Sequence, residues 1–408
     1  MQTEKNIMRL HRNLVLAVLE ALNYIFNDGL MASKVVEKTL KKDKRWGSND
    51  RKFIAETIYE IVRWRRLYNE IAGTKEHYTK DNLWKIFAVW AILKGIKLPE
   101  WGHFIGTPER RIKGKFDEIQ SVRKIRESIP DWLDALGEKE LGKLWDKELH
   151  ALNQPAEVIL RVNTLRTTKI ALKKKLESEG VAVKIHAKYP DALILVERKN
   201  VFITEAFKNG FFEVQDASSQ LVSAFLDVQP GFRVIDACAG AGGKTLHLAS
   251  LMQNKGQIIA LDIYKNKLNE LKRRAKRNGA HNIEQRHIES SKTIKKLHNS
   301  ADRLLIDAPC SGLGVLKRNP DAKWKLKPEF IDQIKVTQQE ILNNYCKMLK
   351  VKGQMVYATC SILPSENKAQ ITEFLKNNAN FKLLKEQKVS PVQSGFDGFY
   401  MALLERTA

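Results

Sequence analysis

Residues 236–245 read Asp-Ala-Cys-Ala-Gly-Ala-Gly-Gly-Lys-Thr, directly after the short apolar run 233–236. A strand, a glycine-rich turn and a helix in this order bring backbone N–H groups close to a bound ligand. A phosphate-binding Walker A loop would require glycine at position 238, where this chain has Cys238. The stretch therefore predicts a loop for a nucleoside cofactor rather than an ATPase loop, and by itself it leaves NAD open as that cofactor.

Strands and helices alternate from Gly231 onward. Five apolar runs are candidate strands: Arg233–Asp236, Gln257–Asp262, Ile283–Ile288, Arg303–Asp307 and Gln354–Ala358. This alternation, with a helix expected over Lys265–Asn278, predicts an α/β fold in which helices cover both faces of a parallel sheet. Ligands of such sheets bind beyond the carboxyl ends of the strands, and there Asp262 can accept hydrogen bonds from ribose hydroxyls.

Two further strand ends carry a cysteine. The fourth candidate strand continues into Asp307-Ala-Pro-Cys310, and the fifth continues into Thr359-Cys360-Ser361. If these strands are neighbours, both thiols emerge beside the cofactor at one edge of the sheet. A free cysteine is usually a small buried hydrophobe, and we expect that structural role for Cys238 and Cys346.

Two thiols beside a carboxyl group are the groups that methylation of carbon 5 of cytosine requires. Carbon 5 of cytosine is too weak a nucleophile to attack a methyl sulfonium directly, whereas a thiolate that adds at carbon 6 creates an enamine that can. A carboxyl group such as Asp307 can stabilise the adduct at ring nitrogen 3. A second thiol can then assist the release of the product.

The combined motifs resemble the RsmB/Nop2/Sun family of RNA (cytosine-5-)-methyltransferases, most closely the bacterial RsmB-type 16S rRNA enzymes. Supporting segments are Arg161–Leu165, Val214–Gln220, Arg318–Asp321 with Trp324, and Asp397–Tyr400, and the resemblance covers residues 126–408. It implies a Rossmann-like methyltransferase domain that uses S-adenosylmethionine. It also implies that Cys360 is the nucleophile and that Cys310 is needed for product release.

The resemblance also implies the cofactor contacts. They would fall on Cys238, Ala239, Gly240, Ala241, Gly242, Gly243 and Lys244, together with Asp262 and Asp307. The family usually has an aspartate after the third strand to hold the adenine side of the cofactor. Here the local sequence is Arg-His-Ile-Glu-Ser over residues 286–290, so Glu289 is the candidate for that contact.

The chain is long enough for two or three domains. Residues 1–149 have helical periodicity, and their segments Ser48–Phe53 and Tyr59–Arg63 resemble the NusB-like RNA-binding extension of the bacterial enzymes. Ser48-Asn-Asp50 is expected to cap a helix. Residues 150–226 resemble the small ferredoxin-like RNA-binding segment of the family, and residues 227–408 are the expected catalytic domain.

Charge and composition favour RNA as the partner. With 70 Lys and Arg against 47 Asp and Glu, the formal net charge is +23, which predicts binding to a polyanion. The basic and aromatic run Arg63–Tyr68 either binds RNA or is part of a helix with a solvated charged face. The four cysteines lack CxxC spacing, so we expect no metal site.

The apolar stretch Leu14–Phe26 is too short to cross a bilayer and is followed by no cleavage site for a signal peptidase. We therefore expect a cytoplasmic protein with no membrane association. Nothing in the sequence indicates an obligate protein partner, and a monomer is expected.

Several rival functions remain open at this stage. The NusB-like resemblance of the helical first part favours small-subunit ribosomal RNA over transfer RNA as the substrate, but a tRNA cytosine-5 methyltransferase stays an alternative. A DNA cytosine methyltransferase would use the Pro-Cys thiol as its nucleophile, and an amino-group methyltransferase would typically have an aromatic residue in place of Cys310. A non-catalytic RNA-binding assembly factor could retain the fold. A NAD oxidoreductase would explain the glycines but neither of the two cysteines.

Overall fold

The computed structural model describes residues 9–408, which form two compact units. One unit comprises the helical residues up to Asn153 together with the short segment Arg318–Leu326. The other comprises Gln154–Lys317 and Lys327–Ala408 and contains both β-sheets.

The larger sheet has seven strands in the order β10-β11-β9-β8-β5-β6-β7. Their bounds are β5 (Arg233–Asp236), β6 (Gln257–Asp262), β7 (Ile283–His287), β8 (Ala301–Asp307), β9 (Leu349–Thr359), β10 (Phe381–Val389) and β11 (Phe399–Arg406). The five strands expected from the sequence are the parallel ones. The chain thus has the Rossmann-like fold that the motifs predicted.

Strands β10 and β11 are antiparallel additions that the sequence analysis did not predict. Strand β10 lies at the edge of the sheet, and seven of its nine residues are exposed, Lys382 and Lys388 among them. An edge strand of this kind lacks the continuous apolar run that marks a buried parallel strand.

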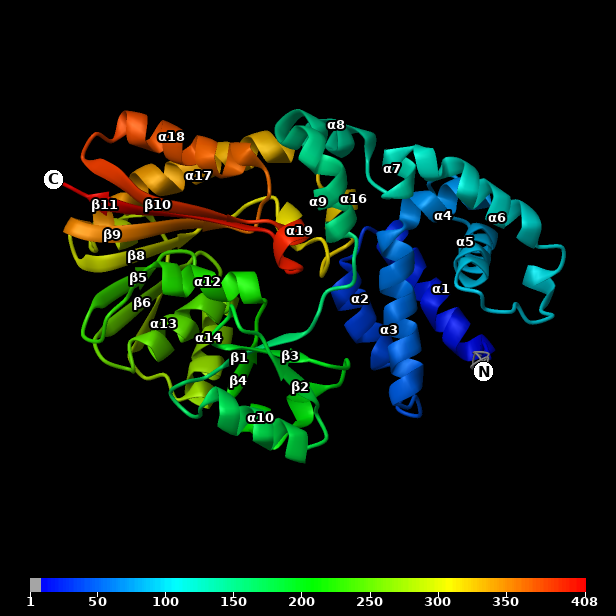
Figure 1. The fold of residues 1–408 in the computed structure, drawn as a ribbon, viewed down its shortest axis with the longest axis horizontal. Helices are drawn as coiled ribbons and strands as arrows, with labels where there is room; N and C mark the ends of the chain where they lie inside the picture. The colour runs from blue at the N-terminus through cyan, green and yellow to red at the C-terminus, as the bar shows by residue number, and fades with distance from the viewer. Residues whose placement is uncertain (1–8) are drawn as a thin grey trace. The chain divides into compact units, whose positions relative to one another are not determined.

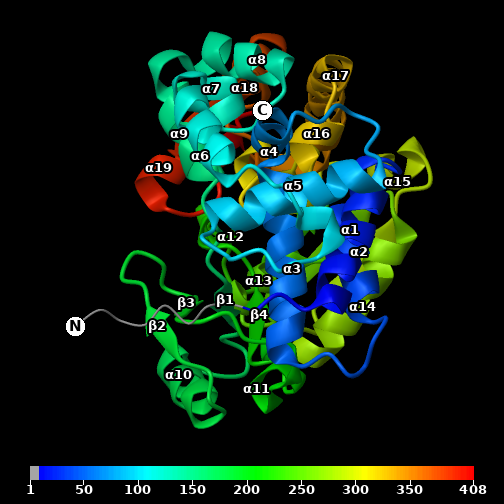
Figure 2. The same cartoon turned by 90° about the vertical axis from the view of Figure 1, so that its right-hand side faces the viewer.

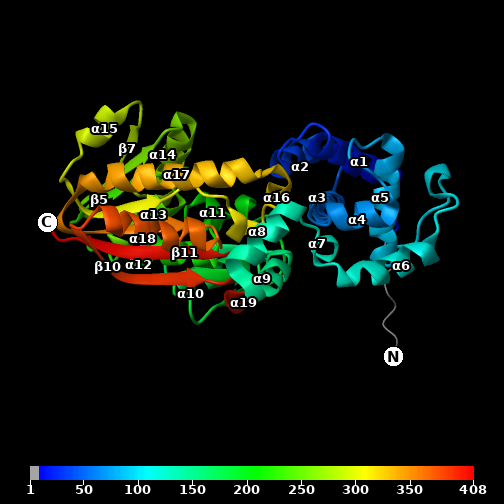
Figure 3. The ribbon, with the colours of Figure 1, turned by 90° about the horizontal axis from the view of Figure 1, so that it is seen from above.

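Helices cover both faces of the seven-stranded sheet, as Figures 1 and 3 show. One face carries α12 (Ala217–Phe225), α13 (Gly243–Leu251) and α14 (Lys265–Asn278), and the other carries α15 (Ser291–Lys295), α17 (Pro328–Tyr345) and α18 (Lys368–Asn377). Neighbouring strand residues alternate between the two cores: Val234 packs with the first set of helices and Ile235 with the second. This alternation explains why the parallel strands are apolar throughout.

The smaller sheet has four strands in the order β2-β3-β1-β4. Its elements are β1 (Ile159–Val162), α10 (Lys169–Ser178), β2 (Val183–Ile185), β3 (Ala192–Leu195), α11 (Glu205–Lys208) and β4 (Phe212–Val214). This β-α-β-β-α-β sequence is the ferredoxin-like arrangement. Strands β2 and β4 are only three residues long, which is too short for a clear pattern in the sequence.

The helical unit contains no strand among residues 9–153. Its helices are α1 (Arg12–Phe26), α2 (Ala32–Leu40), α3 (Ser48–Arg63), α4 (Arg65–Ala72), α5 (Lys80–Leu93), α6 (Glu109–Glu118), α7 (Arg123–Arg126), α8 (Asp131–Leu141) and α9 (Trp145–Leu152). Ser48 is the first residue of α3 rather than its cap; the Asp50 carboxylate instead accepts a hydrogen bond from the Gly47 N–H. Within the described residues, no helix is both long and apolar enough to cross a bilayer.

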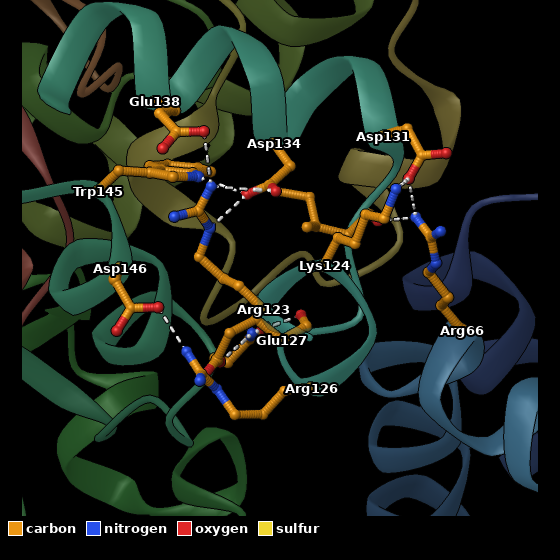
Figure 4. Close-up of polar contacts among 12 residues, drawn as sticks. Arg66, Arg123, Lys124, Arg126, Glu127, Asp131, Asp134, Glu138, Trp145 and Asp146 are labelled. Carbon is orange, nitrogen blue, oxygen red and sulfur yellow. Dashed lines mark hydrogen bonds and ion pairs between the residues drawn. The ribbon is translucent and has the colours of Figure 1, made fainter. Parts of the chain in front are cut away.

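No residue of the run Arg63–Tyr68 is exposed, so the run is not a solvated charged face. Tyr68 is buried, and the Arg66 guanidinium binds the Ile129 carbonyl and the Asp131 carboxylate at 2.7 Å each. Figure 4 shows Arg66 within a cluster of ion pairs that joins α4, α7, α8 and α9. Its central pair, Arg123 Nε to Asp134 Oδ1, is 2.8 Å long. These basic side chains therefore hold helices together.

The segment Arg318–Leu326 belongs to the helical unit although it follows β8 of the larger sheet in the chain. It contains α16 (Ala322–Lys325), which lies beside α4 in Figure 2. The Trp324 indole N–H donates to the Val62 carbonyl at 3.1 Å, and the Arg65 guanidinium lies over the Trp324 ring. Lys323 is buried and donates to the Asn153 side chain at 3.1 Å.

Asp321 caps a helix that lies almost 300 positions earlier in the chain. Its Oδ2 accepts a hydrogen bond from the N–H of Ala32, the first residue of α2, at 3.0 Å. Met31, which precedes α2, provides no side-chain cap. A carboxylate at this end of a helix satisfies a free N–H group and interacts favourably with the helix dipole.

Asp321→Ala is therefore expected to destabilise the helical unit by about 1–2 kcal/mol. Amide hydrogen exchange should accelerate first at Ala32–Val35, in the first turn of α2. Asp321→Asn keeps an acceptor oxygen and should retain most of the protection. Equal exchange rates in Asp321→Ala and the wild type would contradict this capping role.

Candidate active site

The glycine loop runs from β5 into α13 at the point where the strand order of the sheet reverses. Strand β5 has β8 on one side and β6 on the other, so the loop leaves the sheet at a topological switch point. Gly240 and Gly242 have positive φ angles of 55° and 85°. The φ of Gly242 is one that other residues rarely adopt, and a Cβ atom there would also lie 2.0 Å from a methyl group of Leu271 in α14.

Asp262 fixes the loop and faces the same space. Its Oδ2 accepts the Gly240 N–H and its Oδ1 accepts the Tyr264 N–H, each at 2.8 Å. A cavity of about 490 Å³ opens beside these groups. The residues that line it include Asp236, Ala237, Cys238, Ala239, Gly240, Ala241, Gly243, Lys244, Asp262, Ile263, Tyr264, Ile288, Asp307, Pro309 and Tyr345.

This cavity suits S-adenosylmethionine in size and chemistry. Its volume lies within the usual range for small-molecule sites. The Asp262 carboxylate can accept hydrogen bonds from a ribose, and the aromatic and aliphatic side chains of Tyr264, Ile288 and Tyr345 offer apolar surface for a purine.

Lys244 and Asp307 form an ion pair at the floor of the cavity, with 2.6 Å between Lys244 Nζ and Asp307 Oδ2. Burial lowers the pKa of Lys244, but the charge of Asp307 and the hydrogen bond to it outweigh that effect, and the pKa is raised overall. Lys244 also lies 5.3 Å from the centre of the Phe399 ring. The lysine therefore keeps its proton beside the carboxylate.

Cys310 and Cys360 lie side by side, with 3.3 Å between their Sγ atoms. Strands β8 and β9 are parallel neighbours whose register pairs Asp307 with Ala358, so both chains leave the sheet at the same level. The pKa of the Cys310 thiol is raised well above its usual range by its hydrogen bond to Cys360, by burial, and by the nearby charges of Cys360 and Glu366.

The other two cysteines have different surroundings. Burial, followed by the charges of Asp236, Asp307 and Asp262, raises the pKa of Cys238 well above its usual range. Burial raises the pKa of Cys346 to about 11, and its thiol donates to a backbone carbonyl within the same turn. Both thiols are thus kept protonated.

Most residues expected at the cofactor site line the cavity, but two do not. Gly242 faces α14 and acts through the shape of the loop. Glu289 was the expected acid after the third strand, yet its side chain is 79% exposed and the preceding Ile288 lines the cavity instead. The structure does not bring Glu289 to the cofactor site, because β7 ends at His287 and the chain turns outward after Ile288.

Residues of the small sheet and of the helices α12 and α14 also surround the cofactor loop, and the sequence suggested no role for them. Val214, Gln215 and Ser219 line the cavity. The buried Arg161 of β1 donates to the Gly243 carbonyl at 2.5 Å, and Arg274 of α14 donates to the Ala241 carbonyl at 2.7 Å. Spacing alone could not have assigned these contacts, since they join distant parts of the sequence.

Comparison with known proteins agrees with this geometry. The family model described as 16S rRNA methyltransferase RsmB/F matches residues 223–405, and the ferredoxin-like domain of RsmF/B-like methyltransferases matches residues 129–202. The chain is 35% identical over 325 residues to ribosomal RNA small subunit methyltransferase B of Pectobacterium atrosepticum, covering 76% of this chain and 74% of that protein.

Two further proteins extend the comparison. Identity to the probable ribosomal RNA small subunit methyltransferase B of Bacillus subtilis is 32% over 317 residues, covering 71% of this chain and 70% of the relative. The crystal structure of PH0851 superposes with a TM-score of 0.84 at 25% identity, covering 98% of this chain and all of the other. The chain therefore belongs to the RsmB/F family of S-adenosylmethionine-dependent 16S rRNA methyltransferases.

Proposed function

We propose that this protein methylates carbon 5 of a cytosine in small-subunit ribosomal RNA through a covalent adduct with Cys360. The observation that carries this proposal is the pair of thiols, Cys310 and Cys360, whose sulfurs lie 3.3 Å apart just beyond the ends of β8 and β9. Cys310 follows Asp307 by three residues. The names of the relatives support ribosomal RNA as the substrate. The net charge of +23 supports a polyanionic partner.

The residues at the cofactor cavity would hold S-adenosylmethionine through the glycine loop, Asp262 and the apolar wall around Tyr264. When bound, this cofactor supplies an electrophilic methyl group, which carbon 5 of an activated cytosine can accept.

Cys360 activates the base. Its thiolate forms an S–C6 bond, and the electron pair of the C5=C6 bond becomes available at carbon 5. Negative charge develops at the ring nitrogen 3 edge of the base. In the Lys244–Asp307 pair, Lys244 Nζ donates to Asp307 Oδ2 at 2.6 Å, and the protonated lysine offers a donor for that charge.

The raised pKa of Cys310 supports the division of roles between the thiols. A thiol that holds its proton is a poor nucleophile, so the raised pKa suits the release role that the family resemblance implies for Cys310. Once Cys360 is bonded to carbon 6, its negative charge and its role as acceptor disappear, and with them two of the causes that raise the Cys310 pKa. Cys310 can then lose its proton to water and take the proton from carbon 5. The C5–H electron pair restores the C5=C6 bond, and Cys360 leaves as a thiolate.

The Cys310→Ala variant is expected to accumulate protein covalently joined to RNA, because the release step fails. With S-adenosylmethionine and 16S rRNA, a denaturing gel should show a slow band that disappears in the Cys310→Ala/Cys360→Ala double variant. Cys346→Ala serves as a control and should show neither the band nor a loss of methylation. Methylation that survives in Cys360→Ala, or an adduct that depends on Cys310, would overturn the mechanism; an adduct with tRNA alone would change the substrate class.

Alkylation with iodoacetamide tests the electrostatic argument directly. In the wild type the Cys310 rate should keep rising above pH 9, because the raised pKa keeps the thiol protonated at lower pH. In Cys360→Ala the hydrogen bond and charge are gone, so the Cys310 pKa falls, and the rate should be higher at pH 8 and level off at a lower pH than in the wild type. Peptide mass spectrometry would follow Cys310 separately from Cys238 and Cys346. An unchanged pH profile in Cys360→Ala would contradict the coupling.

Cofactor binding provides a further check. Asp262→Ala removes an acceptor for the ribose and releases the Gly240 N–H, so the Kd for S-adenosylmethionine should rise by roughly tenfold to a hundredfold. Glu289→Ala, on the exposed turn, should leave the Kd within about twofold. Calorimetric titration measures both, and a larger loss in Glu289→Ala than in Asp262→Ala would reassign the cofactor site.

A further inference from the structure

Glu366 is fully buried and connects the two cysteine loops. Its Oε1 accepts hydrogen bonds from the hydroxyls of Ser311 and Ser361, each at 2.5 Å. Its Oε2 accepts the backbone N–H of Ser311 at 2.8 Å. Ser311 directly follows Cys310, and Ser361 directly follows Cys360. One carboxylate is thus bonded to the residue next to each thiol.

Glu366 is held by two further side chains, Gln338 through its carboxylate and Tyr357 through its backbone carbonyl. Gln338 of α17 donates to Glu366 Oε2 at 3.1 Å and to the Pro309 carbonyl at 3.0 Å. The Tyr357 hydroxyl donates to the Glu366 carbonyl at 2.7 Å. Each hydrogen bond to the two carboxylate oxygens comes from a donor group, so both oxygens act as acceptors.

The adjacent Asn367 completes the hold on the Cys360 turn. Its Oδ1 accepts the Thr359 hydroxyl at 2.5 Å, and its Nδ2 donates to the Ser361 carbonyl at 2.9 Å. The residues before and after Cys360 are therefore both fixed by the dipeptide Glu366-Asn367.

Burial of the Glu366 carboxylate lowers the stability of the fold unless another benefit offsets it. A buried carboxylate is unfavourable unless its oxygens are well bonded, and an apolar residue could fill the same space without that penalty. The benefit lies at the two sulfurs, whose separation of 3.3 Å is sensitive to small shifts of either loop. Misplacement of a reacting group by about 1 Å can lower a rate by roughly a hundredfold.

We propose that Glu366 is a positioning residue that sets the distance between Cys310 and Cys360, assisted by Asn367. This inference rests on the proposed function for its role in catalysis, but the distance itself can be tested without RNA. Glu366 is not among the residues that line the cofactor cavity, so it acts through the two loops. When Cys360 is bonded to the base, the same link keeps Cys310 close enough to take the carbon 5 proton.

A dithiol reagent tests the distance. Phenylarsine oxide bridges two close thiols: each S–H loses its proton, two As–S bonds form, and the arsenic oxygen leaves as water. The wild type should form the Cys310–Cys360 bridge rapidly, as detected by peptide mass spectrometry. Glu366→Gln keeps the volume but turns one acceptor into a donor, and the bridging rate should fall by about tenfold or more. Alkylation of either thiol alone should change much less than bridging, because each stays accessible.

The catalytic part of the role is tested in the Cys310→Ala background, where adduct formation isolates the attack by Cys360. Glu366→Gln should slow adduct formation by up to about a hundredfold and leave the Kd for S-adenosylmethionine within about twofold. Gln339→Ala is the matched control: it removes hydrogen bonds from the next residue of α17 to Gln370 and should preserve both rates.

Bridging and adduct rates in Glu366→Gln equal to those of the wild type would overturn the inference. If Glu366→Gln does not fold, Ser361→Ala provides a second test, because it removes one hydroxyl contact to Glu366 while Ser311 stays bonded. A smaller fall in the bridging and adduct rates is then expected. Unchanged rates in Ser361→Ala would overturn the inference as well. Rapid bridging in a wild type that forms no adduct under any condition would instead overturn the proposed function, while a slower bridge in Glu366→Gln would still support the positioning role.

Discussion

The register between β8 and β9 is the constraint on which the site depends. Hydrogen bonds between these parallel strands pair Asp307 with Ala358, and each chain then continues for two or three residues to its cysteine. A shift by one residue would turn one of the side chains toward the opposite face of the sheet. The apolar residues of both strands are buried in cores on two faces, and this double burial fixes the register.

The cofactor cavity is assembled by a second set of connections. The glycine loop leaves β5 at the switch point of the sheet, and Asp262 of β6 anchors it by one hydrogen bond. Two arginines bind its carbonyls from outside: Arg161 in the ferredoxin-like sheet and Arg274 in α14. Arg274 also pairs with the buried Glu213 of β4. The small sheet is therefore part of the same compact unit as the cofactor loop and lines its cavity.

Part of the positive charge of the chain is engaged in ion pairs within the protein. Arg66, Arg123 and Arg126 are engaged in ion pairs within the helical unit, and Arg274 and Arg277 bind Glu213. Each of these side chains is partly buried and already engaged with a carboxylate of its own unit. The segment Arg318–Leu326 shows the same use of charge, since its Asp321 caps α2 and its Lys323 is buried against polar groups.

The sequence by itself determined the parallel strands, the cofactor loop and the cysteines at two strand ends, because these features are local: apolar runs, glycines that permit positive φ, and residues that follow a strand directly. It could not determine the antiparallel strands β10 and β11, since an exposed edge strand carries a weak pattern. It placed Glu289 near the cofactor, whereas the turn after β7 exposes that side chain. Tertiary structure alone decided three features: the distance between the thiols, the link through Glu366, and the insertion of residues 318–326 among the helices. Each of them joins residues far apart in the chain through packing that no local pattern encodes.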